Sequence, residues 1–147
     1  FAREILNEKN GPPPEINLFN EKNNGETVLK LIENNFIKAA HDVSLGGIIT
    51  SIAKMCINGK KGASLKKPKQ LIDPFEYFFS EDQGRYIIEI EENNFKNVTE
   101  ILEKNSVHYD DLGTVNENEL IIDEKSKLTI DELMKSHTSW LTNYMGK

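Results

Sequence analysis

The pattern of apolar and polar positions changes its period within residues 37–56, IKAAHDVSLGGIITSIAKMC. The first residues of this stretch predict a buried strand, and residues 41–47 predict a tight turn that is rich in glycine. After the turn, apolar residues recur on one face of a helix, at Ile48, Ile49, Ile52, Ala53 and Cys56. The stretch is therefore predicted to form a strand, a turn and an amphipathic helix around which the rest of the chain is organised.

Two interpretations of this turn remain open. Gly46 and Gly47 lack a Cβ, and a turn before a helix gathers unpaired N–H groups that suit an anion such as phosphate. Alternatively, the glycines allow the helix to pack closely on the sheet, the Ser44 hydroxyl caps the helix, and Asp42 accepts backbone hydrogen bonds. The residue types alone favour packing, because the spacing matches neither a dinucleotide fingerprint nor a P-loop. The Asp42 carboxylate also repels phosphate unless a metal or a hydroxyl lies between them.

Weaker patterns predict the other elements. Helices are predicted at 26–34, at 95–104 and from residue 130 onward, and strands at 63–65, 86–91, 107–115 and 119–123. The second of these helices is expected to turn four residues inward: Phe95, Val98, Ile101 and Leu102. Trp140 and Leu141 are expected to anchor the last helix to the body of the protein. Because strands and helices mix without strict alternation, we expect the α+β class, with a mixed β-sheet and helices packed largely on one face.

Length and charge narrow the class of protein. The chain has 147 residues, enough for one domain with a hydrophobic core, and its formal net charge of −6 disfavours nucleic acid as a partner. The first residues, FAREILNEKN, lack the apolar segment of a signal peptide, and the longest apolar stretch is too short to span a membrane. The single cysteine, Cys56, suggests a buried reduced thiol in a cytoplasmic protein, and no Cys-x-x-Cys pair supports a zinc site.

The ends of the sequence suggest how the chain is organised. Residues 11–14, Gly-Pro-Pro-Pro, predict a stiff extended segment. We therefore expect residues 1–14 to be an arm from a missing upstream region and residues 15–147 to be one domain, and the start at Phe1 agrees with a piece of a longer protein. A lysine cluster is expected to be a solvated loop, with a docking patch for an acidic partner as the alternative: Lys60, Lys61, Lys66, Lys67 and Lys69.

A second group of polar residues lies at 80–85, Ser-Glu-Asp-Gln-Gly-Arg, just before a predicted strand. Glu81 and Asp82 could hold a metal ion, and Arg85 could bind a carboxylate or phosphate in a forked geometry. The alternative is a surface loop in which Arg85 neutralises Glu81. His41 could act as a base in a cleft shared by both groups, but a packed histidine is the simpler interpretation.

The two groups together resemble a known family. Residues 41–47, HDVSLGG, resemble the H-D-x-S-D-G-G motif of the large subunit of phosphoribosylformylglycinamidine synthase, the PurL type. Residues 79–85 are similar to the family's F-[GS]-E-x-x-x-R, and residues 111–115 resemble its I-G-x-V strand. The order and spacing also match at 11–13 and 62–63, so that the resemblance covers nearly the entire chain. The chain therefore resembles the C-terminal, aminoimidazole ribonucleotide (AIR) synthase-related domain of that enzyme, and this implies the corresponding α+β fold.

The resemblance implies an ATP-dependent C–N ligase of purine synthesis. The family enzyme converts formylglycinamide ribonucleotide, ATP and glutamine-derived ammonia to formylglycinamidine ribonucleotide. ATP and Mg²⁺ are implied as cofactors of the complete enzyme, bound mainly outside this fragment. The implied partners are the N-terminal domains of the same enzyme, a glutaminase subunit, a small accessory subunit and the ribonucleotide substrate, with neither nucleic acid nor a membrane.

The resemblance places the family's catalytic histidine in a part absent here, so we expect no catalytic residue and no metal ligand in this chain and no activity from the fragment alone. The candidate ligand- or phosphate-binding residues are His41, Asp42, Ser44, Gly46, Gly47, Glu81, Gln83 and Arg85. Leu45 stands where the family commonly has an acid, which puts binding at this turn in question. The alternatives are the equivalent domain of another ATP-dependent enzyme of the AIR synthase superfamily and a stand-alone binding or scaffold module.

Overall fold

The computed structural model describes residues 5–8, 11, 14–66 and 73–146. The chain divides into two compact units, which are Phe1–Ser51 with Ile72–Asp110 (unit 1) and Ile52–Leu71 with Asp111–Lys147 (unit 2). Two expectations fall partly outside the described residues, namely the proline arm at Pro12 and Pro13 and the lysine cluster at Lys67 and Lys69. The division into an arm at 1–14 and one domain at 15–147 stays a prediction.

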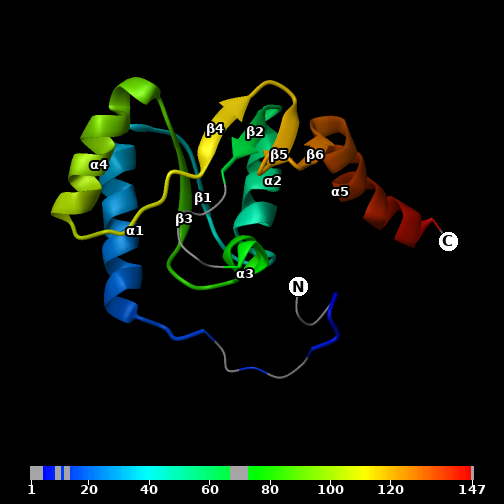
Figure 1. Cartoon of the computed structure of the whole chain (residues 1–147), viewed down its shortest axis with the longest axis horizontal. Coiled ribbons are helices and arrows are strands. Elements are labelled where there is room, and N and C mark those ends of the chain that lie inside the picture. Colours follow the sequence, from blue (N-terminus) through cyan, green and yellow to red (C-terminus); the bar gives the residue numbers. More distant parts are fainter. Residues whose placement is uncertain (1–4, 9–10, 12–13, 67–72, 147) are drawn as a thin grey trace. The chain divides into compact units, whose positions relative to one another are not determined.

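Unit 1 packs helices on a two-stranded antiparallel ladder. Its elements are α1 (Leu18–Glu33), β1 (Ile37–Asp42), the start of α2 (Gly47–Gly59), α3 (Pro74–Phe79), β3 (Tyr86–Ile90), the short 3₁₀ helix η1 (Glu92–Asn94) and α4 (Phe95–Lys104). β1 pairs with β3, and α1 and α4 lie side by side against them (Figure 1). The core of this unit is Leu31 from α1 with Val98 and Leu102 from α4. Ile37, Ile88 and Ile90 of the two strands pack against that core, so the helices cover one face of the ladder.

Unit 2 contains the mixed sheet that the sequence predicts. The strand order is β4 (Gly113–Asn116), β2 (Gly62–Leu65), β5 (Glu119–Ile122) and β6 (Ser126–Thr129), followed in the chain by α5 (Ile130–Met145). β2 runs antiparallel to β4 and parallel to β5, and β6 runs antiparallel to β5. The α+β class is confirmed, and the sheet strands divide between this sheet and the ladder of unit 1.

The organising stretch folds as predicted, with one correction. β1 is half-buried rather than buried, because its residues alternate between partly buried and exposed positions along the strand. α2 ends at Gly59, and its inward face is buried as the helical period indicates, at Ile48, Ile49, Ile52 and Cys56.

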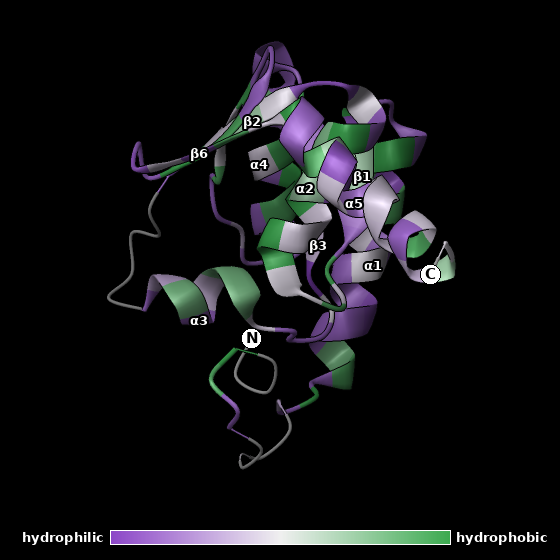
Figure 2. Ribbon diagram, turned by 90° about the vertical axis from the view of Figure 1, so that its right-hand side faces the viewer, coloured by the Kyte–Doolittle hydropathy of each residue, from purple (hydrophilic) through white to green (hydrophobic). Residues whose placement is uncertain are grey.

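The helix predicted at 26–34 ends where expected but begins at Leu18. The Asn17 side chain accepts a hydrogen bond from the Asn20 N–H at 3.0 Å and so caps the earlier start. The prediction missed this start because the first turns carry exposed apolar residues, Leu18 and Phe19, and hence no inward stripe. α3 was not predicted either, although Asp73 caps it and Pro74 occupies its first turn. Figure 2 shows that this short helix carries both hydrophilic and hydrophobic residues.

The strand predicted at 107–115 is wrong over most of its length, because β4 begins only at Gly113. Gly113 has a φ of +142°, and a Cβ there would lie 1.9 Å from the Ser64 carbonyl oxygen, so the close pairing of β4 with β2 requires glycine. β6 was missed because Ser126–Thr129 are mostly exposed and show no alternation of apolar and polar residues that would mark a strand.

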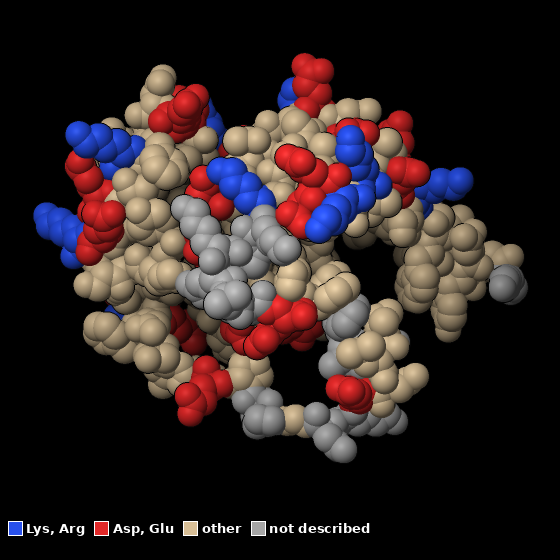
Figure 3. Space-filling view, viewed as in Figure 1, with Lys and Arg blue, Asp and Glu red and all other residues tan. Residues whose placement is uncertain are grey.

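Two inward-facing expectations are also wrong. Phe95 is 46% exposed at the start of α4, whereas Val98 and Leu102, one and two turns further on, are buried. Trp140 and Leu141 do not anchor α5, because they are 66% and 57% exposed. Figure 3, in the view of Figure 1, shows the last turns of α5 as a surface without charged side chains. The start of α5 is as predicted, and Thr129 and Glu132 form a reciprocal capping box there.

Candidate functional site

The β1–β3 ladder brings the two polar segments of the sequence together in unit 1. Asp42 pairs with Tyr86 at the end of the ladder, and the Val43 N–H donates to the Arg85 carbonyl at 2.9 Å. The turn that leaves β1 therefore starts beside the loop that enters β3. The buried Ser51 of α2 donates from its hydroxyl to the Asp42 carbonyl at 3.1 Å, which ties the helix to the strand end.

The start of α2 is capped from the neighbouring loop. The Gly46 N–H donates to Glu81 Oε1 at 2.8 Å, and the Gly47 N–H donates to the Ser44 carbonyl at 3.0 Å. Among the described residues, the Ser44 hydroxyl makes no capping bond to these N–H groups. A carboxylate is favoured at this position by the positive end of the helix dipole. The Gly46 N–H, which is expected to bind an anionic ligand, thus already donates to the Glu81 carboxylate of the same chain.

The two glycines meet different surroundings. Gly46 and Gly47 have φ of +86° and +70°, in the left-handed region that disfavours other residues. A Cβ on Gly47 would lie 2.6 Å from the Phe78 carbonyl oxygen and 2.8 Å from Phe79 Cα. These are backbone atoms at the end of α3, so Gly47 allows the turn to pack directly against that helix.

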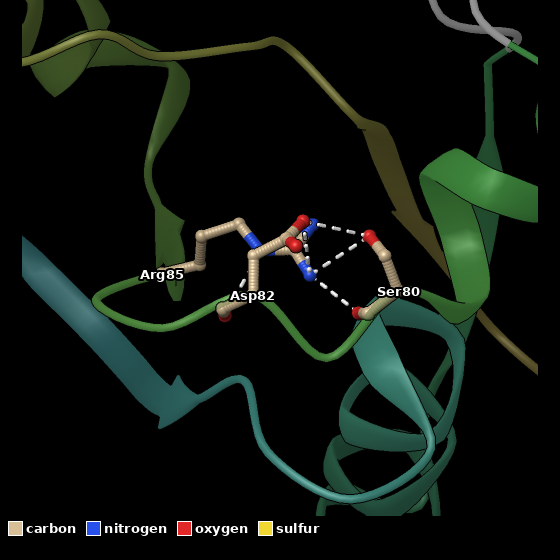
Figure 4. Close-up of polar contacts among 3 residues, drawn as sticks. All are labelled: Ser80, Asp82 and Arg85. Carbon is tan, nitrogen blue, oxygen red and sulfur yellow. Dashed lines mark hydrogen bonds and ion pairs between the residues drawn. The ribbon is translucent and has the colours of Figure 1, made fainter. Parts of the chain in front are cut away.

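Arg85 is bound within its own loop (Figure 4). Its guanidinium donates to the Ser80 carbonyl and, at 3.1 Å, to the Ser80 hydroxyl, and it lies 3.3 Å from the Asp82 carboxylate. Its Nε donates to the Asp82 carbonyl at 3.3 Å, and the Ser80 hydroxyl donates to the Asp82 carboxylate at 2.9 Å. The neutralising partner is therefore Asp82 and not Glu81, which faces the Gly46 N–H. Because the N–H donors of Arg85 already bind groups of the loop, this side chain stabilises the loop and does not offer these donors to a ligand.

A pocket of about 350 Å³ opens between this loop, the turn and α1. It is lined by Glu21, Asp42, Val43, Ser44, Glu81, Gln83, Gly84, Arg85 and Tyr86. α1 is fixed as its wall because the Asn24 side chain donates to the Gly84 carbonyl at 3.0 Å and because Gly84 lies against Glu21. The pocket thus belongs wholly to unit 1.

Five of the eight candidate residues line this pocket: Asp42, Ser44, Glu81, Gln83 and Arg85. Gly46 reaches it only through the hydrogen bond to Glu81, and Gly47 packs against α3 instead. His41 does not line it, and its Nδ1 lies 3.6 Å from the carboxylate of the adjacent Asp42. Sequence reasoning missed Glu21 and Tyr86. Tyr86 could have been inferred from its place at the start of β3. Glu21 could not, because it lies in the first turns of α1, which the sequence pattern does not predict.

The charges of the pocket favour a positive group or hydrogen-bond donors over bare phosphate. Three carboxylates face it, from Glu21, Asp42 and Glu81, and the guanidinium of Arg85 is already paired. Within the described residues, no group of three or more His, Cys, Asp or Glu side chains could hold a metal ion. The arrangement can bind and orient polar groups.

A separate polar contact in unit 1 involves Tyr77 and Asp110. The Tyr77 hydroxyl donates to the Asp110 carboxylate at 3.0 Å. Burial, followed by this hydrogen bond, raises the pKa of Tyr77 to about 12. The neutral phenol is thus stabilised, and this contact joins α3 to the end of unit 1 outside the pocket lining.

The fold and this site correspond to a known domain family. The model of the AIR synthase related protein, C-terminal domain, matches residues 1–125, and the chain belongs to this family. It is homologous to phosphoribosylformylglycinamidine synthase subunit PurL, being 72% identical over 145 residues to PurL of Pelagibacter ubique and 36% identical over 147 residues to PurL of Bartonella henselae. These matches cover 99% and 100% of the chain. The chain spans about 20% of the length of these curated relatives.

Solved structures agree on the fold. Thermotoga maritima PurL complexed with FGAR matches with a TM-score of 0.71 over 81% of this chain and 21% of that chain, at 20% identity. The structure of PurLQS from the same organism matches with a TM-score of 0.70 over 90% of this chain and 24% of that chain, also at 20% identity. Among the described residues, no helix combines the length and the apolar character needed to cross a membrane.

Proposed function

We propose that the chain is the C-terminal domain of the large subunit of phosphoribosylformylglycinamidine synthase. The observation that carries this proposal is the 72% identity to PurL of Pelagibacter ubique over 99% of the chain. The activity belongs to the longer polypeptide, since the chain spans about 20% of that relative. The reaction is the ATP- and glutamine-dependent amidation of formylglycinamide ribonucleotide in purine synthesis.

Within this reaction the chain serves as a wall of the substrate cleft and supplies no catalytic residue. ATP transfers a phosphoryl group to the amide oxygen of the substrate, and ammonia then attacks the amide carbon as inorganic phosphate leaves with that oxygen, so that the rate depends on positioning and on charge stabilisation. The pocket supports a positioning role, because Ser44 and Gln83 offer hydrogen bonds at its surface. An anion would reach the Gly46 N–H only by displacing Glu81.

The cofactors and partners follow from the same proposal. ATP is the nucleotide of the complete enzyme, in line with the structures of Thermotoga maritima PurL complexed with ATP and with ADP, and we place its binding mainly outside this chain. Mg²⁺ accompanies the ATP, and the carboxylates of this chain do not form a cluster suited to it within the described residues. The partners are the N-terminal domains of the same polypeptide, a glutaminase subunit and a small accessory subunit, in line with the PurLQS structure. The cytoplasmic location expected from the sequence stays a prediction.

Two alternatives make different predictions. The equivalent domain of a related ATP-dependent enzyme would act on another substrate, and a stand-alone binding or scaffold module would need no enzymatic partner. The coding sequence next to this chain separates the last case from the others, because an upstream ATP-binding domain in the same reading frame excludes a solitary module.

The direct test compares the 147-residue chain with the complete polypeptide. With ATP, Mg²⁺, glutamine, the glutaminase subunit, the small accessory subunit and formylglycinamide ribonucleotide, the complete polypeptide forms formylglycinamidine ribonucleotide and ADP. The chain alone forms neither. Turnover by the chain alone would refute the assignment of the chemistry to the rest of the polypeptide, and inactivity of the complete polypeptide would refute the proposed reaction.

A further inference from the structure

An apolar stripe runs along α5, and only its first part is covered. Ile130 is 4% exposed, and Leu133 and Met134 are half-buried in the turns that follow β6. The same face of the helix continues through four strongly exposed residues, with 66%, 57%, 69% and 74% exposure: Trp140, Leu141, Tyr144 and Met145. In Figure 1 the last turns of α5 extend beyond the strands of unit 2. The stripe is therefore longer than the surface that this unit offers to cover it.

The uncovered part is large and carries no charged side chains. Residues 136–146, SHTSWLTNYMG, contain no Asp, Glu, Lys or Arg, and Figure 3 shows this end of α5 without red or blue atoms. The rings of Trp140 and Tyr144 stack with centroids 5.5 Å apart, and the two residues are 66% and 69% exposed. Small polar residues beside the rings, Ser136, Ser139 and Asn143, line a shallow hollow of about 430 Å³. An apolar patch of this size with a polar border is typical of an interaction surface.

The PurL relatives contain much polypeptide beyond the part that matches this chain. The family model stops at residue 125, before α5 begins. The match to PurL of Bartonella henselae nevertheless covers all 147 residues, so the length of chain that forms α5 is present in that subunit. About four-fifths of these relatives lies outside the matched region. The helix thus lies beyond the residues that the family model matches, within a polypeptide that contains much further surface.

We propose that the last two turns of α5 dock, through Trp140 and Tyr144, on an uncharged apolar surface of the remaining part of the same polypeptide. This inference rests on the proposed function, because it takes the longer PurL-type polypeptide as the partner. The absence of charge from 136–146 fits a partner surface that is also uncharged. A membrane surface fits less well, since helices that lie on membranes carry Lys or Arg along their polar face. A second copy of the chain is the alternative that the experiment must distinguish.

The test measures hydrogen exchange in the complete polypeptide. In the double variant Trp140→Ser/Tyr144→Ser we expect backbone amides of α5 and of one segment outside this chain to exchange at least about tenfold faster than in the unaltered polypeptide. The matched control, Lys135→Ala/Thr142→Ala, changes exposed residues on the other side of the same helix and leaves both regions unchanged. A change confined to α5, or equal changes in both variants, would overturn the proposal.

A second measurement needs no variant. Hydroxyl-radical labelling of Trp140 in the folded complete polypeptide is expected to fall at least about fivefold below that in the denatured polypeptide, although this residue is 66% exposed in the 147-residue chain. Labelling close to the denatured level would overturn the proposal. Protection that appears only with a concentration-dependent dimer in sedimentation would assign the face to a second copy instead. Synthase activity of the unaltered polypeptide is assayed in the same preparation, so an active enzyme with an unprotected Trp140 refutes the docking alone.

Discussion

Replacing Gly47 by alanine perturbs the corner between β1 and α2 most sharply. Gly47 has a φ of +70°, and an added Cβ would lie 2.6 Å from the Phe78 carbonyl oxygen and 2.7 Å from the Phe79 carbonyl carbon. These atoms belong to the backbone of α3 and its end, so they cannot move aside as a flexible side chain does. Gly47→Ala therefore combines an unfavourable backbone conformation with overpacking.

Both costs can be estimated from known magnitudes. A residue other than glycine in the left-handed region costs about 1–2 kcal/mol, and overpacking against a rigid neighbour costs about 1–3 kcal/mol. We expect Gly47→Ala to lower the free energy of unfolding by about 2–5 kcal/mol, a large part of the roughly 5–15 kcal/mol of an ordinary domain. Gly47→Val should cost more, because its side chain is larger and branched at Cβ.

The assay is urea unfolding followed by circular dichroism, with Gly59→Ala as the matched control. Gly59 ends the same helix, and a Cβ there would meet nothing within 4 Å. The control is expected to leave stability unchanged or to raise it by up to about 1 kcal/mol, as alanine does in helices. If Gly47→Ala and Gly59→Ala unfold at the same urea concentration with equal slopes, the close approach of the turn to α3 is refuted.

Three further changes test the remaining contacts. Glu81→Ala removes the acceptor of the Gly46 N–H, and we expect a loss of about 1 kcal/mol in urea unfolding together with tighter binding of inorganic phosphate by calorimetry; unchanged phosphate binding would refute a usable anion site at this turn. Arg85→Lys keeps the charge but loses the forked guanidinium that contacts both Ser80 and Asp82, and should lower the free energy of unfolding by about 1–3 kcal/mol. A melting temperature equal to that of the unaltered chain would contradict a stabilising role for these contacts. Tyr77 has its pKa raised from 10.0 to about 12, so its contribution to stability is fully present below pH 10 and is lost as the pH rises towards 12. Ultraviolet titration should show one tyrosine ionising near pH 12 that is absent in Tyr77→Phe, and a titration curve unaltered by that substitution would contradict the assignment.

The parts of the fold that follow from a strong local period could be predicted. The strand, turn and helix at 37–59 are confirmed, because buried Ile48, Ile52 and Cys56 repeat at helical spacing after a glycine turn. The core positions Val98 and Leu102 of α4 are confirmed for the same reason. The apolar period of α5 continues to the end of the helix, but only the residues near its start are buried. The period alone does not show which part of an apolar stripe packs against a neighbour.

The site depends on contacts between distant residues, and these limit what the sequence can predict. The sequence indicates two polar segments, at 41–47 and 80–85. They lie side by side because the register of the β1–β3 ladder pairs Asp42 with Tyr86. Glu21 enters the pocket from a helix start that no apolar pattern marks. The alternative in which Arg85 neutralises Glu81 is wrong, because spacing along a loop does not define which carboxylate turns towards the guanidinium.

The central claim is that this chain is a necessary but non-catalytic part of a PurL-type synthase, and growth without purines tests it most directly. In a host that lacks its own synthase but expresses the matching glutaminase and small accessory subunits, the complete reading frame is expected to restore growth on purine-free medium. The same frame ending just before Phe1 is not expected to restore growth, and neither is the 147-residue chain alone. Growth supported by the shortened frame would show that the chain is dispensable, and growth supported by the chain alone would show that it carries the chemistry itself; either result would contradict the account.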